Sequence, residues 1–121
     1  MASTLDTITV DCADAQTLAD LWCAALGLRV GDADEAGEYV AGERGLGIHF
    51  QVVPEPKGLK NRVHLDPRPS DAMAKEVERL KALGAPELRY VEEGGGSWTV
   101  MQDPEGNESC VLRGPEHGWS Q

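Results

Sequence analysis

The sequence lacks a long hydrophobic run, a basic leader segment and paired cysteines. No apolar stretch approaches the roughly 20 residues that a helix needs to cross a bilayer. The opening stretch MASTLDTITVD has no basic segment ahead of an apolar core, so we expect no signal peptide and no membrane partner. Cys12, Cys23 and Cys110 are odd in number and widely spaced, without a CxxC pair. This spacing argues against a disulfide framework or a structural zinc site and predicts a reducing, cytoplasmic location.

Positive charge is also scarce. Lysine and arginine together number 11, against 21 aspartates and glutamates, which gives a formal net charge of -10. Phosphate backbones repel so acidic a surface, and we therefore expect no nucleic-acid partner. A cationic small molecule would be attracted to it. The alternative is that the acidity only keeps the protein in solution, and composition does not choose between the two.

The first half of the sequence predicts a strand, a helix and three short strands. Leu5–Asp11 alternates apolar with polar residues, as a half-buried strand does. Asp14 is placed to cap the start of a helix, and Gly27 suits the left-handed residue that often ends one. The apolar stripe between them comprises Leu18, Leu21, Trp22, Ala25 and Leu26. The three strands are expected at Leu28–Val30, Glu38–Ala41 and Leu46–Val53, with a loop over Gly31–Gly37 and a turn over Gly42–Gly45.

The second half opens with the polar connector Pro54–Leu59, followed by the stretch KNRVHLDP. Its core, Asn61–Pro67, alternates as the opening strand does, with Val63 and Leu65 on the apolar side. A helix is then expected to begin at the N-cap Ser70 and to end at Gly84. Its buried stripe is Met73, Val77 and Leu80. Three strands follow at Glu87–Glu92, Ser97–Asp103 and Glu108–Leu112, with turns at Gly94–Gly96 and Pro104–Asn107.

The chain is therefore predicted to be strand–helix–strand–strand–strand written twice. Module one covers about 1–56 and module two about 57–121. Neither module alone can cover both faces of its sheet, so we expect one α+β domain over 1–121. Ile8 and Val10 would lie under the helix of module one, and Val63 and Leu65 under the helix of module two.

The opposite faces of the predicted strands carry polar and ionisable groups. In module one these are Thr7, Thr9, Asp11, His49 and Gln51. In module two they are Arg62, His64, Asp66, Glu108, Cys110 and the apolar Leu112. If the two sheets curl, these side chains converge on one concave pocket. The alternative is a solvated surface whose polar groups pair with one another.

Several stretches resemble one known superfamily. The segments KNRVHLD and WTVMQDPEGNESCVL, the helix endings in Leu-Gly and the duplicated layout are similar to the glyoxalase/bleomycin-resistance/dioxygenase (vicinal oxygen chelate) superfamily, in particular its glyoxalase-like branch. The resemblance covers nearly the whole chain. It implies two tandem βαβββ modules with curled mixed sheets around a small-molecule cavity, and frequent homodimers.

The resemblance also implies a divalent metal held by His, Gln or Glu from the first and last strands of each module. Carried over, these positions fall at Thr7, Arg62 and Cys110 and near His49–Gln51. Threonine is a poor ligand, and arginine stays protonated and has no lone pair to offer. We therefore expect no metal cofactor at the usual site. A shifted site, in which His64 joins His49 and Glu108 or Cys110, stays open, as does simple hydrogen bonding of His64 to Asp66 or Glu108.

The first functional hypothesis is a metal-free small-molecule-binding protein. The residues expected to line its cavity are His49, Gln51, Arg62, His64, Asp66, Trp98, Glu108 and Cys110. Arg62 would pair with an anionic group of the ligand, or with Asp66 if the ligand is neutral. Relatives that resemble bleomycin-resistance proteins sequester cationic drugs, but their grooves are rich in aromatics, which make up only 5% of this chain.

The second hypothesis is an enzyme in the same cavity: a lyase, isomerase or dioxygenase. It would use a divalent metal or, without one, His64 as a general base held by Asp66. Cys110 is a possible nucleophile or simply a buried thiol. Trp98 either stacks on a planar ligand or belongs to the core. The sequence leaves open whether there is turnover.

Overall fold

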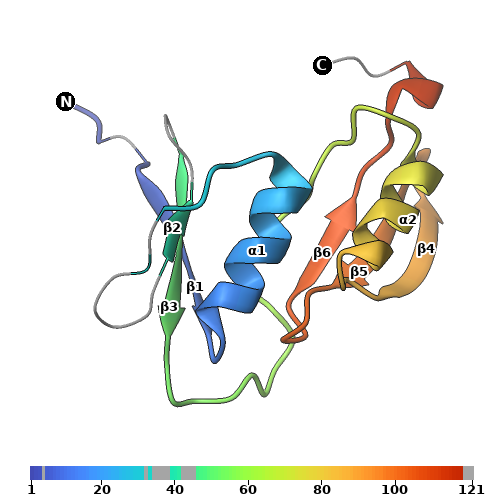
Figure 1. Cartoon of the computed structure of the whole chain (residues 1–121). Coiled ribbons are helices and arrows are strands. Elements are labelled where there is room, and N and C mark those ends of the chain that lie inside the picture. The colour runs from blue at the N-terminus through green and yellow to red at the C-terminus, as the bar shows by residue number, and fades with distance from the viewer. Residues whose placement is uncertain (4, 32, 34–38, 42–45, 119–121) are drawn as a thin grey trace. The chain divides into compact units, whose positions relative to one another are not determined.

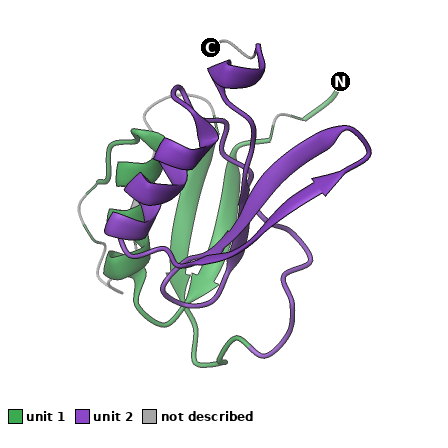
Figure 2. Cartoon of the chain, turned by 90° about the vertical axis from the view of Figure 1, so that its right-hand side faces the viewer, with its two compact units in different colours: residues 1–57 green, residues 58–121 purple. Residues whose placement is uncertain are grey.

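The computed structural model describes the chain except for residues 4, 32, 34–38, 42–45 and 119–121 (Figure 1). It divides into two compact units, an N-terminal unit of Met1–Lys57 and a C-terminal unit of Gly58–Gln121 (Figure 2). Each unit holds one α-helix and one three-stranded sheet, which confirms the expected α+β class. Within the described ranges, no helix has both the length and the apolar character needed to cross a membrane.

The N-terminal unit packs one helix on a mixed sheet. Its elements are β1 (Thr7–Cys12), α1 (Ala15–Leu26), β2 (Tyr39–Ala41) and β3 (Gly47–Val52). β3 lies in the centre of the sheet, parallel to β1 and antiparallel to β2. α1 contacts β2 and β3.

The start and end of α1 are those predicted. The Asp14 carboxylate accepts a hydrogen bond from the backbone N–H of Thr17 at 3.1 Å, and its second oxygen accepts the Thr17 hydroxyl at 2.7 Å. These bonds lower the pKa of Asp14, because they favour its charged form. Gly27 ends the helix with φ 66°. Leu18 and Trp22 of the predicted stripe are buried, and Cys23 is buried beside them.

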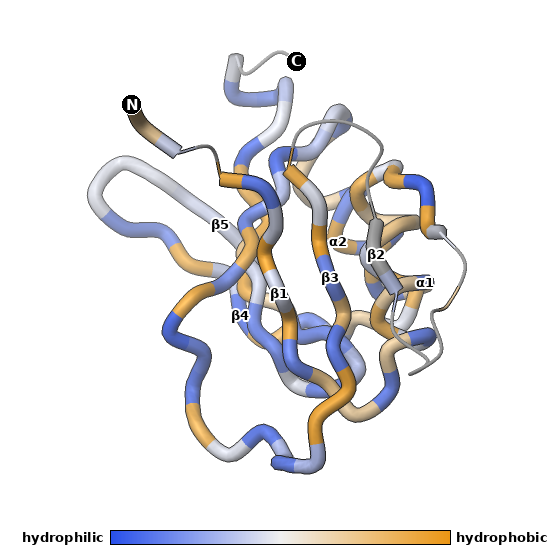
Figure 3. Tube along the Cα trace, turned by 90° about the vertical axis from the view of Figure 1, so that its left-hand side faces the viewer, coloured by the Kyte–Doolittle hydropathy of each residue, from blue (hydrophilic) through white to orange (hydrophobic). Residues whose placement is uncertain are grey.

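The two faces of this sheet are also those predicted. In the parallel register, Ile8 lies beside Ile48 and Val10 beside Phe50, which is fully buried. The next positions pair Thr9 with His49 and Asp11 with Gln51, so these polar residues share the other face. Figure 3 shows this alternation of hydropathy along β1 and β3.

The C-terminal unit packs one helix on an antiparallel sheet. Its elements are α2 (Met73–Ala82), β4 (Glu87–Glu93), β5 (Gly96–Gln102), β6 (Glu108–Val111) and the 3-10 turn η1 (Pro115–His117). The strand order is β4-β5-β6. Gly94 and Gly95 join β4 to β5 with φ 58° and 82°, the left-handed backbone that a tight hairpin turn requires.

One contact identifies the face of this sheet that α2 covers. The Thr99 hydroxyl lies 3.2 Å from the sulfur of Met73, the first residue of α2. Thr99, Met101 and their neighbour Val111 are buried, as are Val77 and Leu80 of the predicted helix stripe. Because strand side chains alternate, Trp98, Val100 and Gln102 lie on the opposite face.

The prediction of a regular strand over Asn61–Pro67 is wrong. Leu65 forms only an isolated parallel bridge with Ser109, and the side chain of Val63 is 72% exposed instead of lying under α2. The carbonyls of Leu65 and Pro67 both accept from β6 and the residue after it. In a parallel ladder residue 67 would also donate to β6, but proline has no N–H, so the ladder stops there.

The other differences concern element ends and strand number. Ser70 does not cap α2: the N-cap is Ala72, and the Met73 N–H donates instead to the Glu116 carboxylate at 2.7 Å. The strand expected at Leu28–Val30 is reduced to a bridge at Val30. The turn Gly42–Gly45 and most of the loop Gly31–Gly37 lie outside the described residues. Among the described residues each unit thus has three strands in an open sheet, not the four strands curled around a cavity that were expected.

Candidate functional site

The candidate site lies on the face of the C-terminal sheet opposite α2, here called the helix-free face. β5 and β6 pair with Val100 beside Cys110 and Gln102 beside Glu108. In an antiparallel sheet such partners share a face, so the helix-free face comprises Trp98, Val100, Gln102, Glu108 and Cys110. This position of Trp98 was not predictable, because its strand does not alternate cleanly in sequence. The prediction that Glu108 and Cys110 share a face is confirmed.

The segment of residues 60–67 brings two more predicted residues to this face. The Cys110 N–H donates to the Leu65 carbonyl at 3.3 Å, and the Leu112 N–H donates to the Pro67 carbonyl at 3.0 Å. Leu65 is the bridge partner of Ser109 and shares its face. His64 and Asp66, one residue to either side, therefore lie on the face of Cys110.

His64 and Asp66 form a hydrogen-bonded pair. Nδ1 of His64 lies 2.8 Å from Oδ1 of Asp66, and 39% and 38% of the two side chains are exposed. This confirms the interpretation that Asp66 holds His64 by a hydrogen bond. Asp66 is not paired with Arg62, whose side chain is exposed. A carboxylate on Nδ1 fixes the orientation of the imidazole ring and directs Nε2 outward as the reactive nitrogen.

Cys110 completes a compact group with this pair. One ligand-type atom from each of His64, Asp66 and Cys110 can be chosen so that all lie within 4.8 Å of one another. Burial raises the pKa of the Cys110 thiol, and the negative charges of Asp66 and Glu108 raise it further. The thiolate is the nucleophilic form, so this environment disfavours Cys110 as a nucleophile.

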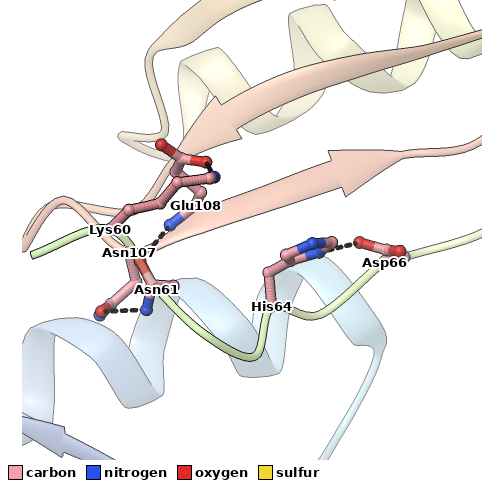
Figure 4. A network of polar contacts seen from close by, with 6 residues as sticks. All are labelled: Lys60, Asn61, His64, Asp66, Asn107 and Glu108. Carbon is pink, nitrogen blue, oxygen red and sulfur yellow. Dashed lines mark hydrogen bonds and ion pairs between the residues drawn. The ribbon is translucent and has the colours of Figure 1, made fainter.

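Glu108 is held in a separate polar network (Figure 4). Its carboxylate accepts from the Lys60 ammonium at 2.5 Å, and its backbone N–H donates to the Asn61 side-chain oxygen at 3.1 Å. The Asn61 amide also donates to the Asn107 side chain at 3.1 Å. Sequence reasoning did not assign roles to Lys60 and Asn61, although both lie in the KNRVHLD stretch.

The turn before β6 is organised by a buried carboxylate. Asp103 is 3% exposed and accepts from the backbone N–H groups of Glu105 and Asn107 at 2.9 and 3.0 Å and from the Asn107 side chain at 2.8 Å. The DPEGN motif thus positions Asn107 and the start of β6, which confirms its prediction as a turn.

The remaining predicted site residues lie elsewhere. His49 and Gln51 are on the polar face of the N-terminal sheet, in the other unit. A single cavity that joins them to His64 stays a prediction. A pocket of about 440 Å³ in the C-terminal unit lies instead at the end of the β4–β5 hairpin, beside Tyr90, Arg113 and His117, and none of the predicted residues line it.

At two of the positions that the resemblance implies for the usual metal site, the side chains do not suit a metal ion. Thr7 uses its hydroxyl to donate to Asp6 at 2.6 Å, and Arg62 has no lone pair to offer a cation. His64, Asp66 and Cys110 do carry donor atoms that suit a divalent transition metal. Among the described residues they are the one group of three or more such side chains close enough to share an ion.

Solved structures similar to this chain belong to the same superfamily. A mutant of the fosfomycin resistance protein FosX from Listeria monocytogenes, complexed with Mn(II) and 1S,2S-dihydroxypropylphosphonic acid, is 18% identical with a TM-score of 0.77 and covers 94% of this chain and 92% of its own. A glyoxalase/bleomycin resistance protein/dioxygenase family enzyme from Burkholderia phytofirmans PsJN is 17% identical with a TM-score of 0.73 over 90% and 97% of the two chains. A glyoxalase-related enzyme from Fulvimarina pelagi is 16% identical with a TM-score of 0.73 over 94% and 90%.

These identities establish a shared fold and no more. No curated protein matches this sequence closely. The family model of the glyoxalase-like domain, however, matches residues 7–112, which span both sheets and both helices. The chain therefore belongs to the glyoxalase-like domain family.

Proposed function

We propose that this protein binds a small molecule on the helix-free face of its C-terminal sheet. The observation that carries the proposal is the gathering of His64, Asp66 and Cys110 beside Glu108 on one face of the sheet. A histidine, two carboxylates and a thiol converging from two separated segments form the kind of polar group that orients a ligand. The four ligands of the usual metal site are not required for such binding.

The charges of this face favour a ligand that carries a positive group. Asp66 and Glu108 place two carboxylates there, and the chain as a whole has a net charge of -10. Trp98 lies on the same face and offers a ring on which a planar or cationic ligand can stack. Arg62, two residues before His64, would pair with an anionic substituent where the ligand has one.

The 2.8 Å bond between His64 and Asp66 favours a second candidate function. A histidine held through Nδ1 by a carboxylate can take a proton at Nε2, which is the arrangement of a general base. An enzyme that removes a proton from a bound substrate would use this pair without any further group. The similar structures from Burkholderia phytofirmans PsJN and Fulvimarina pelagi are described as enzymes, which supports this candidate.

The first test is a titration with a panel of cationic antibiotics, read by thermal shift and by calorimetry. We expect at least one member to bind, and Asp66→Asn to weaken that binding about tenfold, as expected for the loss of a charged hydrogen-bonding partner. Glu78→Gln is the matched control, because Glu78 is an exposed acid on α2 that pairs with Lys81 at 3.3 Å. If no member of the panel shifts the melting temperature, binding of cationic drugs is wrong for this protein.

Substitution of His64 distinguishes the two candidate functions. For a binding protein, His64→Ala changes affinity and no ligand is converted. For an enzyme, the same variant, checked by circular dichroism to be folded, loses turnover while a His64-independent ligand still binds. Mass spectrometry of each ligand after incubation decides between the two functions. If every compound that binds is recovered unchanged, the protein sequesters its ligand and does not convert it.

A further inference from the structure

We infer that the pocket at the end of the β4–β5 hairpin binds a zwitterionic amino acid with an aromatic side chain. Its volume of about 440 Å³ lies within the range of roughly 300–1,000 Å³ that is usual for small-molecule pockets. The residues that line it belong to the C-terminal unit, and none of them is part of the group on the helix-free face. The inference does not depend on the small-molecule binding proposed above.

The pocket lies where α2 stops covering its face of the sheet. α2 begins over Thr99, whose hydroxyl contacts the sulfur of Met73. The helix runs towards the other end of β5, since the carbonyl of Pro86, just after the helix, accepts from the Gln102 N–H at 2.9 Å. The end of the hairpin beyond Thr99 is therefore left without a covering helix, and Figure 2 shows the hairpin reaching past the helix of the same unit.

Three side chains converge on this uncovered end of the sheet. Tyr90 is the register partner of Thr99, and Glu92 lies two residues further along β4, so both are on the face that α2 covers elsewhere. Arg113, two residues after β6, reaches the tip of the hairpin, where its guanidinium donates to the Gly95 carbonyl at 3.3 Å. All three line the pocket.

Two opposite charges line the pocket without pairing with each other. Among the ion pairs between described residues, none joins Arg113 to Glu92. One oxygen of Glu92 accepts the Tyr90 hydroxyl at 2.8 Å, which leaves the other oxygen for a ligand ammonium group. Arg113 has further N–H donors beyond the one bonded to Gly95, and they suit a ligand carboxylate. A ligand with a single charge would be attracted by one of these groups and repelled by the other, so the pocket favours a zwitterion.

Tyr90 favours an aromatic side chain on the ligand. Its side chain is 53% exposed and lines the pocket. The hydrogen bond to Glu92 holds the ring next to the position proposed for the ligand ammonium group, where it can stack on a second ring. An aromatic amino acid carries an ammonium group, a carboxylate and a ring at short spacing, and so offers a partner to each of the three side chains.

The test is a calorimetric titration of the full chain with phenylalanine, tyrosine and tryptophan. We expect at least one of them to bind saturably, with one equivalent per chain. Its amide lacks the carboxylate charge and its N-acetyl derivative lacks the ammonium group, so each should bind at least about tenfold more weakly. Failure of all three amino acids to bind, or equal binding of either derivative, overturns the proposal.

Variants assign each ligand charge to one side chain. Arg113→Gln should weaken binding of the amino acid about tenfold and abolish its advantage over the amide, and Glu92→Gln should do the same relative to the N-acetyl derivative. Arg89→Gln is the matched control, because Arg89 is an exposed arginine of the same hairpin that does not line the pocket. If Arg113→Gln does not fold, Glu92→Gln at an exposed position provides the decision.

Two further outcomes would contradict this site. One is an amino acid that keeps its advantage over both derivatives in these variants. The other is binding that Asp66→Asn weakens and Arg113→Gln does not, which would place the amino acid on the helix-free face instead.

Discussion

At the residue scale, Asp103 shows how a buried charge can serve structure alone. Its carboxylate accepts three hydrogen bonds from within the turn that leads to β6. A buried carboxylate is stable only when such bonds replace its hydration. The same turn sets the position of Asn107, and through Asn61 that of Glu108. The sequence predicted the turn over Pro104–Asn107. It did not predict that the carboxylate of Asp103, the residue just before the turn, accepts the hydrogen bonds that stabilise it.

We predict that Asp103→Ala destabilises the protein by about 1.5–3 kcal/mol, the usual range for hydrogen bonds to a charged group. Asp103→Asn keeps one oxygen for the two backbone donors and loses the bond from the Asn107 side chain, so it should destabilise the protein less than Asp103→Ala does. Urea unfolding at pH 7 measures both. Equal losses in the two variants would show that the charge, and not the turn geometry, carries the stability.

Residue types alone could not assign the site either. His64, Asp66 and Cys110 are separated by up to 46 positions (110 − 64), and only the register between residues 64–67 and β6 brings them together. The alternation of polar residues correctly placed Glu108 with Cys110. It could not choose between His64 paired with Asp66 and His64 paired with Glu108, because both partners fit the same pattern.

At the element scale, the start of α2 is completed from the other end of the unit. Ala72 offers no side-chain cap, so the first free amides need an acceptor from elsewhere. Glu116 supplies it to Met73 with one oxygen and holds the Gly114 N–H at 2.5 Å with the other. A carboxylate at a helix N-terminus also interacts favourably with the helix dipole. The local sequence predicted Ser70 instead, because a partner 43 residues away leaves no local signal.

Gly114 is the residue that allows this contact, through its lack of a side chain and not through its backbone angles. A Cβ there would lie within 2.2 Å of the Asp71 carbonyl oxygen. We predict that Gly114→Ala costs about 1–3 kcal/mol of stability, as overpacking does. Gly58→Ala is the control, because nothing lies within 4 Å of its Cβ position, and it should change stability by less than about 0.5 kcal/mol.

Thermal or urea unfolding of both glycine variants checks this. Hydrogen exchange adds a local readout, since loss of the Glu116 contact should speed the exchange of the first amides of α2. If Gly114→Ala is as stable as Gly58→Ala, residues 114–116 do not pack on the start of α2 in solution.

At the scale of the whole molecule, one exposed strand edge favours self-association. β4 is an edge strand of its sheet, and Leu88 and Tyr90 on it are 41% and 53% exposed. Edge strands with exposed apolar residues are typical places for another chain to pair. From this edge and the family resemblance, we predict a homodimer in which two copies of β4 meet.

We predict a solution mass of twice the 13.0 kDa of one chain by sedimentation or light scattering. Leu88→Lys should shift the equilibrium to the monomer, because it places a charge on the pairing edge. Leu59→Lys replaces a leucine of the connector that is 85% exposed, and it should have no effect on mass. A monomeric wild-type protein at high concentration, or a dimer indifferent to Leu88→Lys, contradicts this interface.

The sequence by itself determined both α-helices and the six strands β1–β6 to within a few residues, and the polar and apolar faces of the N-terminal sheet. These follow from periodicity and from turn residues such as Gly27 and Gly94, which act over short distances. The tertiary structure alone decided the rest. The missing N–H of Pro67 reduced a predicted strand to a bridge, Glu116 replaced the predicted cap, and one register placed Cys110 beside His64 and Asp66. Contacts between residues far apart in the chain depend on which segments pack together, and no local pattern records that choice.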